Sequence, residues 1–453
     1  MSNEKNIKDA PELETEKTPE FDINGYEVVS EDEVNEVMKK YDRESNTRIW
    51  VGVPHRVVQV VMALFSLYCI YSTLFSTASL ERRMTAFLGC VIIMGFLYYP
   101  ASKHHVRPNF IPWYDVIIMV VGAGCFFYYC FVADDLIKVL SSASKMTTMY
   151  NVIAIVGILV LMELCRRCVG VPILVVVAVL LFYTFGVANL TLERALYTLF
   201  YRTGGVIGTP IQVCAKFIVV FIVFGAFLER TGISKFFIDL ANKIAGASAG
   251  GPAKVAVISS ALCGMVSGSS VGNTVTTGSV TIPMMKRTGY KPEFAGAVEA
   301  TSSTGGQIMP PIMGAAAFLM IDFLGQPYSK IIVYAIIPAI LYFAGIYVAV
   351  HLEAKKVGLK GIPRSELPSF WKLQRSIYLL IPLVVLVVLV STNTYTMAFS
   401  ASVAIVLAIF VGLFEICRTT IKAPTPAEGS KGGVIVKETG FMIFNSLANG
   451  GKS

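Results

Sequence analysis

Two apolar stretches of this chain are joined by Gly264-Met265-Val266-Ser267-Gly268-Ser269-Ser270-Val271-Gly272-Asn273-Thr274. The joining segment holds too many glycines and polar side chains to face lipid, yet apolar sequence flanks it too closely for a water-facing loop. Backbone groups left unpaired in hydrocarbon are costly, so a broken helix survives at membrane depth only inside protein or beside a water-filled cavity. Such breaks are typical of binding sites in transporters. The segment therefore predicts a re-entrant hairpin over Lys254–Met285.

The composition of the whole chain is that of a membrane protein. Its 453 residues are 55% hydrophobic and 15% charged, with a mean hydropathy of +0.65, a balance that soluble domains do not show. Apolar blocks of about 18 to 22 residues recur, the length that a helix needs to cross roughly 30 Å of hydrocarbon. These features predict an all-α, polytopic membrane protein. The net charge of +8 does not indicate nucleic acid as a partner, because the basic residues lie at the ends of the apolar blocks.

The apolar blocks also predict where the chain crosses the bilayer. A second interrupted segment follows the hairpin over Pro292–Leu324, and an amphipathic stretch over Thr231–Gly246 is expected along the inner interface. The remaining spans are predicted at Val57–Leu74, Met84–Pro100, Pro112–Ala133, Asn151–Cys165, Val169–Val187, Thr209–Leu228, Ser329–His351, Ser376–Val390 and Met397–Cys417.

The basic residues test this layout. With the N-terminus inside, cytoplasmic loops carry most of the lysines and arginines, including the cluster over residues 355–375, as the positive-inside rule requires. The asymmetry holds only if Lys254–Met285 returns to the side it entered from, because one more crossing would place that cluster outside. The charge distribution thus favours a re-entrant hairpin over a full crossing.

The two ends of the chain carry no spanning segment. Residues 1–50 are predicted to form a polar cytoplasmic extension without a signal peptide, with a short helix over Glu31–Tyr41. Residues 425–453 are predicted to be a polar, glycine-rich tail that begins with a linker over Thr425–Gly433. Between these ends, residues 51–168 and 169–424 are predicted to form two membrane regions.

Two polar breaks carry the predicted site. Glycines let the chain leave helical geometry, and Pro310-Pro311 removes two amide donors. Freed carbonyls together with Ser, Thr and Asn oxygens are ligands that a small hard cation such as Na⁺ prefers. The N-termini of helices that begin after the breaks can face an anionic substrate. The candidate ion- and substrate-binding residues are Ser267, Gly268, Ser269, Ser270, Asn273, Thr276, Glu299, Thr304, Gly305, Gly306, Gln307 and Pro310, with Ser267, Ser269, Asn273, Thr304 and Gly306 as the Na⁺ candidates.

Other interpretations of these residues remain open. Small residues at the breaks are also what close helix packing in membranes requires, although packing alone does not explain the paired prolines. Glu299 is a functional candidate because a carboxylate within an apolar segment is costly; the alternative is a salt bridge to Lys286 or Arg287.

Catalytic and nucleotide-binding motifs are missing. The sequence has no GxxxxGK loop, so ATP is not expected to drive it, and no Ser–His–Asp or metal-ligand set stands out. The pair Cys165 and Cys168 alone does not complete a zinc site. The chain is not expected to be an enzyme.

Three longer motifs point to a family: Ser267-Gly-Ser-Ser-Val-Gly-Asn273, Ile282-Pro-Met-Met-Lys-Arg-Thr-Gly-Tyr290 and Glu299-Ala-Thr-Ser-Ser-Thr-Gly-Gly-Gln307 with the Ile-Met-Pro-Pro that follows. They resemble the large membrane subunit of tripartite ATP-independent periplasmic (TRAP) transporters, in the form in which small and large subunits are fused. The resemblance covers most of the chain after Asn151, whereas the four spans of residues 51–168 resemble the small subunit only in their number and position.

The resemblance implies a secondary transporter in the bacterial inner membrane. It implies import of small organic acid anions, with Na⁺ as the coupling ion and no other cofactor, and a periplasmic substrate-binding protein as partner. In this family the large subunit carries its substrate in an elevator-like motion. By position, Ser267–Asn273 and Thr304–Pro311 match one of the family's two ion-binding halves.

The chain departs from the family in one respect. The large subunit of the family is an inverted repeat with two hairpins, and only one hairpin is found here. The chain is therefore expected to hold the first half of the repeat and the opening of the second, Ser376–Cys417, and to be truncated at its C-terminus. The alternative function is that of a non-transporting membrane scaffold or assembly fragment.

Overall fold

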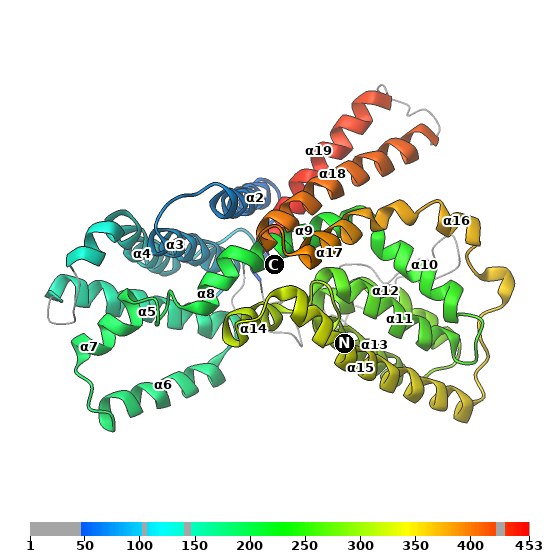
Figure 1. The fold of residues 1–453 in the computed structure, drawn as a ribbon, viewed down its shortest axis with the longest axis horizontal. Coiled ribbons are helices and arrows are strands. Elements are labelled where there is room, and N and C mark those ends of the chain that lie inside the picture. The colour runs from blue at the N-terminus through cyan, green and yellow to red at the C-terminus, as the bar shows by residue number, and fades with distance from the viewer. Residues whose placement is uncertain (1–46, 102–106, 140–145, 423–430, 453) are drawn as a thin grey trace, which may run out of the picture.

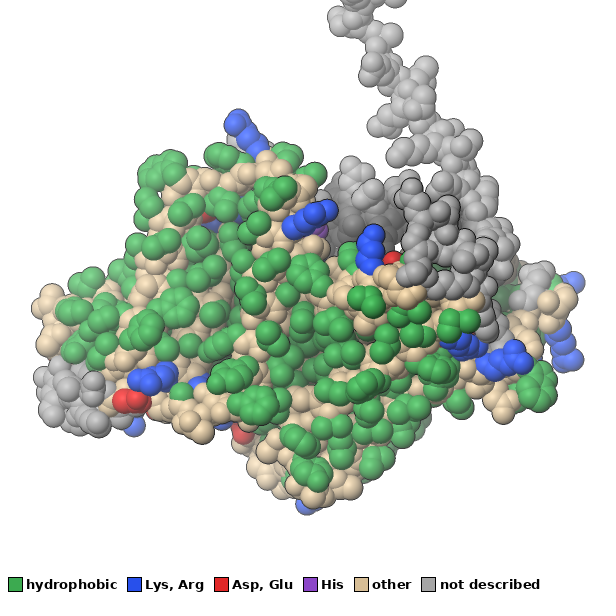
Figure 2. All heavy atoms as spheres, turned by 90° about the horizontal axis from the view of Figure 1, so that it is seen from above, with side chains coloured by type: hydrophobic (Ala, Val, Ile, Leu, Met, Phe, Trp, Pro, Cys, Tyr) green, Lys and Arg blue, Asp and Glu red, His purple; other side chains and the backbone are tan. Residues whose placement is uncertain are grey.

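The computed structural model describes residues 47–101, 107–139, 146–422 and 431–452, and every regular element within them is a helix. Within these described ranges, six helices are long and apolar enough to cross a membrane, which confirms the prediction of an all-α, polytopic membrane protein. Apolar side chains cover most of the face shown in Figure 2, as expected of a surface that meets lipid. The predicted helix over Glu31–Tyr41 lies outside the described residues.

The first membrane region consists of α2 (Val53–Leu74), α3 (Leu80–Tyr98), α4 (Trp113–Val139) and α5 (Thr148–Cys168). A buried charge network ties these helices to the segment before them. Asp115 on α4 pairs with Arg48 and, at 2.7 Å, with Arg167 on α5, and all three side chains are at most 5% exposed. Arg167 Nε also donates to Glu163 Oε1 at 2.8 Å. The network therefore runs from Glu163 at the end of α5 through Arg167 and Asp115 to Arg48.

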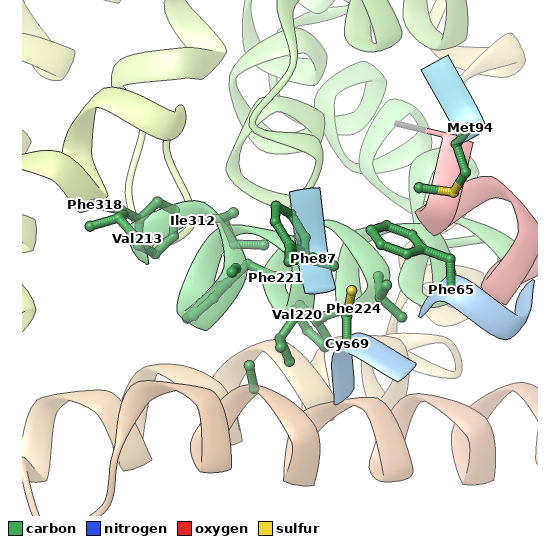
Figure 3. Close-up of a cluster of buried hydrophobic side chains, with 14 of the residues drawn as sticks. Phe65, Cys69, Phe87, Met94, Val213, Val220, Phe221, Phe224, Ile312 and Phe318 are labelled. Atoms are coloured by element: carbon green, nitrogen blue, oxygen red, sulfur yellow. The ribbon is translucent and has the colours of Figure 1, made fainter. Parts of the chain in front are cut away.

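The middle of the chain supplies the core of the molecule. After α6 (Val171–Gly186), none of whose side chains is buried, come α7 (Leu192–Leu196), η3 (Tyr197–Tyr201), α8 (Thr209–Val213), η4 (Cys214–Ile218) and α9 (Val219–Arg230). Figure 3 shows α9 side chains Val220, Phe221 and Phe224 among side chains of α2 and α3 on one hand and Ile312 and Phe318 on the other. The core thus joins the first membrane region to the second polar break.

The predicted hairpin is confirmed. It is formed by α11 (Gly251–Ser267) and α12 (Ser270–Arg287), which pack against each other and turn at Gly268. Gly268 has φ +62°, a conformation that glycine adopts without steric cost. Before the hairpin, α10 (Ile233–Ala245) is the amphipathic helix; it buries Ile233, Phe236 and Phe237 and packs on α11.

The second interruption is confirmed as well. Helix α13 (Pro292–Gly305) leads into the 3₁₀ turn η5 (Gly306–Ile308), and helical geometry resumes only at α14 (Ala315–Leu324). Then α15 (Tyr328–Val357) returns across the same region, and Figure 1 shows α11, α12, α13 and α15 gathered on one side of the molecule.

The C-terminal part differs from the prediction. The elements η6 (Arg364–Glu366), α16 (Phe370–Gln374), η7 (Ile377–Leu380), α17 (Ile381–Thr392) and α18 (Met397–Lys422) are followed by α19 (Lys431–Lys452). The prediction of a polar tail over 425–453 is wrong for residues 431–452, which form this helix and pack against α2, α9 and α18. Small residues allow the close approach: a Cβ on Gly451 would lie 2.4 Å from Met62 O, and Ser66 Oγ donates to Leu447 O at 2.7 Å.

Candidate functional site

The two polar breaks meet at a contact between backbones. A Cβ on Gly264 of α11 would lie 2.3 Å from the Cα of Gly306, and a Cβ on Gly306 would lie 2.7 Å from the Cα of Gly264. Similarly, a Cβ on Gly268 would lie 2.2 Å from Met313 O. No side chain fits between segments this close. Glycine at these positions therefore allows the hairpin tip to pack directly against the unwound part of the broken helix.

Asn273 lies beside this crossing. Its side chain is 1% exposed, and its Nδ2 donates to Ser260 O at 2.8 Å, which ties α12 to α11. Its Oδ1 is buried and has no hydrogen-bond partner. A buried polar atom without a partner is costly and calls for an explanation such as a bound water or ion. The Nδ2 atom of the same amide lies 3.4 Å from a Cβ built on Gly264 or on Gly306, so the unpartnered Oδ1 belongs to a side chain that lies beside the crossing.

Glu299 lies between the hairpin and α13, completely buried. Its carboxyl group contacts four hydroxyls: Ser260 Oγ at 2.8 Å, Ser303 Oγ at 3.0 Å, Thr277 Oγ1 and Thr281 Oγ1. Gly278 leaves room for the side chain, since a Cβ there would lie 3.0 Å from Glu299 Cγ. The alternative of a salt bridge to Lys286 or Arg287 is wrong, because no ion pair involves Glu299 among the described residues.

The hairpin tip is fixed by hydrogen bonds of its own. Ser269 Oγ accepts from Gly272 N at 3.2 Å and caps α12, as serine does at helix N-termini. Ser267 Oγ donates to Ser269 O at 3.4 Å. From the break, Gln307 Nε2 donates to Ser270 Oγ at 3.1 Å. The tip and the break are therefore joined by side chains as well as by backbone contact.

The break itself is held by α15. Tyr328 Oη lies 2.9 Å from Pro311 O and 2.6 Å from Ile312 O, so its single proton is shared between the two carbonyls, and its ring stacks on Phe318 with centroids 4.9 Å apart. The peptide bond between Pro310 and Pro311 is cis. Pro310 and Pro311 donate no amide hydrogen bond, so the tyrosine hydroxyl is the group that satisfies carbonyls at this point.

Removal of that hydroxyl gives a test of its role. Tyr328→Phe is expected to lower the free energy of unfolding by about 1–3 kcal/mol, because it leaves buried carbonyls without a donor. Tyr342→Phe is the matched control: its hydroxyl donates to Thr301 O at 2.8 Å from an exposed position, and its loss should have a smaller effect. Thermal melting in detergent measures both. Equal melting temperatures for the two variants would show that the hydroxyl does not hold the break.

Not all predicted site residues meet at the crossing. Thr276 and Thr304 direct their hydroxyls at carbonyls of their own helices, Gly272 O and Ala300 O, both at 2.8 Å. Gly305 packs instead on α15, since a Cβ there would lie 2.5 Å from a ring atom of Tyr342. The residues that the structure brings together are Ser267, Gly268, Ser269, Ser270, Asn273, Gly306 and Gln307, with Glu299 behind them against the hairpin and Pro310 in the break.

Sequence reasoning did not single out Ser260 or Thr281. A signal was present, because Asn273, Thr277 and Thr281 recur at four-residue spacing and therefore share one face of α12. Glu299 and Ser303 show the same spacing on α13. The pattern predicts a line of polar side chains between α12 and α13. The contribution of Ser260 from α11 is seen only in the tertiary structure.

The donor set at the crossing consists of oxygen atoms. Among the residues that the structure describes, no group of three His, Cys, Asp or Glu side chains is placed to hold a metal. The crossing offers neutral amide, hydroxyl and carbonyl oxygens, which suit hard monovalent cations rather than zinc or iron. The free Oδ1 of Asn273 is the atom on which that fit rests.

Comparison with known proteins agrees with this architecture. Residues 156–430, more than half of the chain, match the family described as "Tripartite ATP-independent periplasmic transporter, DctM component". The chain belongs to this TRAP transporter family. It is a multi-pass membrane protein, and the relatives below are permeases rather than enzymes.

Three TRAP transporter permeases share about a quarter of their aligned residues with the chain. The C4-dicarboxylate TRAP transporter large permease protein DctM of Pseudomonas aeruginosa is 26% identical over 231 residues, which cover 50% of this chain and 53% of the relative. The isethionate TRAP transporter permease protein DctMQ of Oleidesulfovibrio alaskensis is 26% identical over 236 residues, 50% of this chain and 36% of the relative. The sialic acid TRAP transporter permease protein SiaT of Haemophilus influenzae is 24% identical over 313 residues, 67% of this chain and 48% of the relative. The chain thus spans about half the length of these TRAP relatives or less.

Proposed function

We propose that this chain is a membrane permease component of a Na⁺-driven secondary transporter that imports small organic acid anions. A periplasmic substrate-binding protein delivers the anion, and the chain lies in the bacterial inner membrane with its N-terminus in the cytoplasm. Family membership supports the permease role and the binding-protein partner. The relatives named for C4-dicarboxylates, isethionate and sialic acid all act on acids, which supports an anionic substrate.

The observation that carries the ion site is the free, buried Oδ1 of Asn273, a side chain whose amide lies beside the crossing of the two breaks. A dehydrated Na⁺ needs several oxygens at short distance, and unwound backbone supplies them without a charged side chain. A Cβ built on Gly306 of η5 would lie 3.4 Å from Asn273 Nδ2, which supports the proposal that unwound backbone beside this amide contributes oxygen ligands. Na⁺ bound there would hold the hairpin tip against the break.

The anion would lie on the other side of the same turn. Helix α12 begins after Ser269 and α14 begins after Gly314, so two helix N-termini start beside the crossing. Partial positive charge at helix N-termini favours an anion. The cation and the two N-termini together would neutralise a carboxylate or sulfonate.

Sodium is expected to raise the melting temperature of the purified protein, and K⁺ is not. At a Na⁺ concentration about 100 times the Kd, the stabilisation should be about 2.7 kcal/mol. Asn273→Leu should abolish the Na⁺-dependent shift, measured from the variant's own melting temperature in choline. Asn273 is preferred to Ser269 for this test because Ser269 Oγ is already engaged by Gly272 N.

The control is Ser279→Ala on the same helix, whose hydroxyl donates to Thr276 O at 3.2 Å and takes no part in the crossing. It should keep the full Na⁺ shift. Equal stabilisation by Na⁺ and K⁺, or a shift that survives Asn273→Leu, would contradict the proposed ion site.

A further inference from the structure

The surroundings of the Glu299 side chain disfavour an ionised carboxylate. The side chain is fully buried, and among the described residues no Lys, Arg or His pairs with it. Four hydroxyls surround it instead. Burying an unpaired charge is far more costly than burying a neutral hydrogen-bonded acid, so the surroundings suit the protonated group.

Other titratable groups on the surrounding helices do not alter this. On α11, Cys263 is buried nearby, and Lys254 donates to Ser248 Oγ at 3.1 Å. Lys286 and Arg287 are exposed at the end of α12, and Glu293 is exposed in the first turn of α13. On α15, the Tyr342 hydroxyl donates to Thr301 O at 2.8 Å and the Tyr347 ring faces Lys254. The other titratable groups of α15 on this side lie in its last turns: His351, Glu353, Lys355 and Lys356.

The hydrogen-bond pattern can accommodate a proton on Glu299. Thr281 Oγ1 lies 3.0 Å from Thr277 O and also contacts Glu299 Oε2, and a threonine hydroxyl has a single proton to donate but can also accept. Thr277 O lies within α12 and accepts the helical N–H of Thr281 as well, so the Thr281 hydroxyl is free either to donate to the carboxyl group or to accept from it. If Glu299 Oε2 carries a proton, it donates to Thr281 Oγ1, and Thr281 donates to Thr277 O. Glu299 Oε1 then accepts from Ser260 and Ser303.

We propose that Glu299 is a proton-binding site whose occupancy is linked to closure of the hairpin on α13. Three of its four hydroxyl partners, Ser260, Thr277 and Thr281, belong to the hairpin, and only Ser303 belongs to α13. When the hairpin packs on α13, the carboxyl group is dry and holds its proton. When the hairpin separates, water replaces the three hydroxyls, the carboxylate forms, and the proton passes to that water.

The linkage gives the proton a role in transport. A ligand that binds only one of two conformations shifts the equilibrium toward that conformation. A proton taken up on one side of the membrane favours closure, and its release on the other side resets the hairpin. This role, unlike the protonation itself, rests on the proposed transport function. It adds a proton to the Na⁺ proposed above.

Infrared spectroscopy of the detergent-purified chain tests the protonation directly. At pH 7 the wild type should show the carbonyl stretch of a protonated carboxylic acid, with the small downshift in D₂O that marks an exchangeable proton. Glu299→Gln, which keeps the size and one donor of the acid, should lose the Glu299 component of this band, and the difference spectrum between wild type and variant isolates that component from other carboxyl groups such as Glu229 on α9. Glu193→Gln, at an exposed position, should keep it. Absence of the band from the wild type at pH 7 would overturn the proposal.

A second variant covers the case in which Glu299→Gln does not fold. Thr281→Val removes the proposed acceptor of the Glu299 proton, so the band should remain and shift to higher frequency. An unshifted band would overturn the assignment to Glu299. Spectra and melting curves taken in Na⁺ and in K⁺ separate the two proposals. A Na⁺-dependent rise in melting temperature without the carboxylic-acid band would contradict only the proton site. The carboxylic-acid band without a Na⁺-dependent rise in melting temperature would contradict only the Na⁺ site.

Discussion

Asp115→Ala is expected to lower the free energy of unfolding by about 3–5 kcal/mol, the cost of breaking a buried ion pair from one side. Asp115 bridges two guanidinium groups, those of Arg48 and Arg167, and its side chain is fully buried. Its removal leaves two positive charges in the protein interior with only Glu163 nearby for Arg167. Unfolding in detergent micelles, followed by circular dichroism, measures the loss.

The matched control for this prediction is Asp134→Ala on the same helix. Asp134 pairs with Arg82 at 2.9 Å, but the two side chains are 49% and 41% exposed. Exposed pairs contribute about 0–1 kcal/mol, so this variant should unfold almost as the wild type does. If the two aspartate variants are equally stable, the buried ion pairs of Asp115 with Arg48 and Arg167 do not stabilise the protein more than an exposed pair does.

Gly264→Ala is the second substitution with a large expected effect. Its Cβ would lie 2.3 Å from the Cα of Gly306, and the obstacle is backbone, which cannot rotate away as a side chain can. Overpacking commonly costs about 1–3 kcal/mol, and this contact should lie at the upper end. The hairpin would also be held away from the break, so the Na⁺-dependent rise in melting temperature should be lost.

Gly296→Ala provides the comparison on α13. A Cβ at Gly296 would meet nothing within 4 Å, and alanine favours a helix over glycine by about 1 kcal/mol. This variant should be as stable as the wild type or slightly more so, with the Na⁺ response intact. If Gly264→Ala behaves like Gly296→Ala, the two breaks are not in backbone contact.

The sequence predicted more of the fold than of the site. The hairpin at Gly268 and the break before α14 are local events, because glycine, proline and clustered hydroxyls interrupt a helix whatever surrounds it. The amphipathic helix α10 is local in the same sense. By contrast, α19 was predicted as a polar tail, since Lys437, Glu438 and its glycines resemble a loop when read along the chain. Its packing on α2 and α9 depends on surfaces that are remote in sequence.

The sequence was enough to identify which polar side chains belong to the site, but not which residues they contact. Glu299 and Asn273 were identified because a carboxylate and an amide are unusual within apolar segments. Their partners were not, since Ser260 and Thr281 are ordinary small polar residues until α11, α12 and α13 pack together. Asp115 was passed over for the same reason: one carboxylate at the start of an apolar helix gives no sign of the two arginines that it joins.

Hydrophobic length and backbone-breaking residues act over a few turns of chain, so they are enough to predict that this protein is helical, lies in a membrane and unwinds at two places. The contact of the two unwound places through Gly264 and Gly306, and the ring of hydroxyls rather than a cation around Glu299, could not be predicted without the packed helices. Both features depend on how α11, α12 and α13 pack. That packing is set by the shapes of side chains that lie far apart in the sequence.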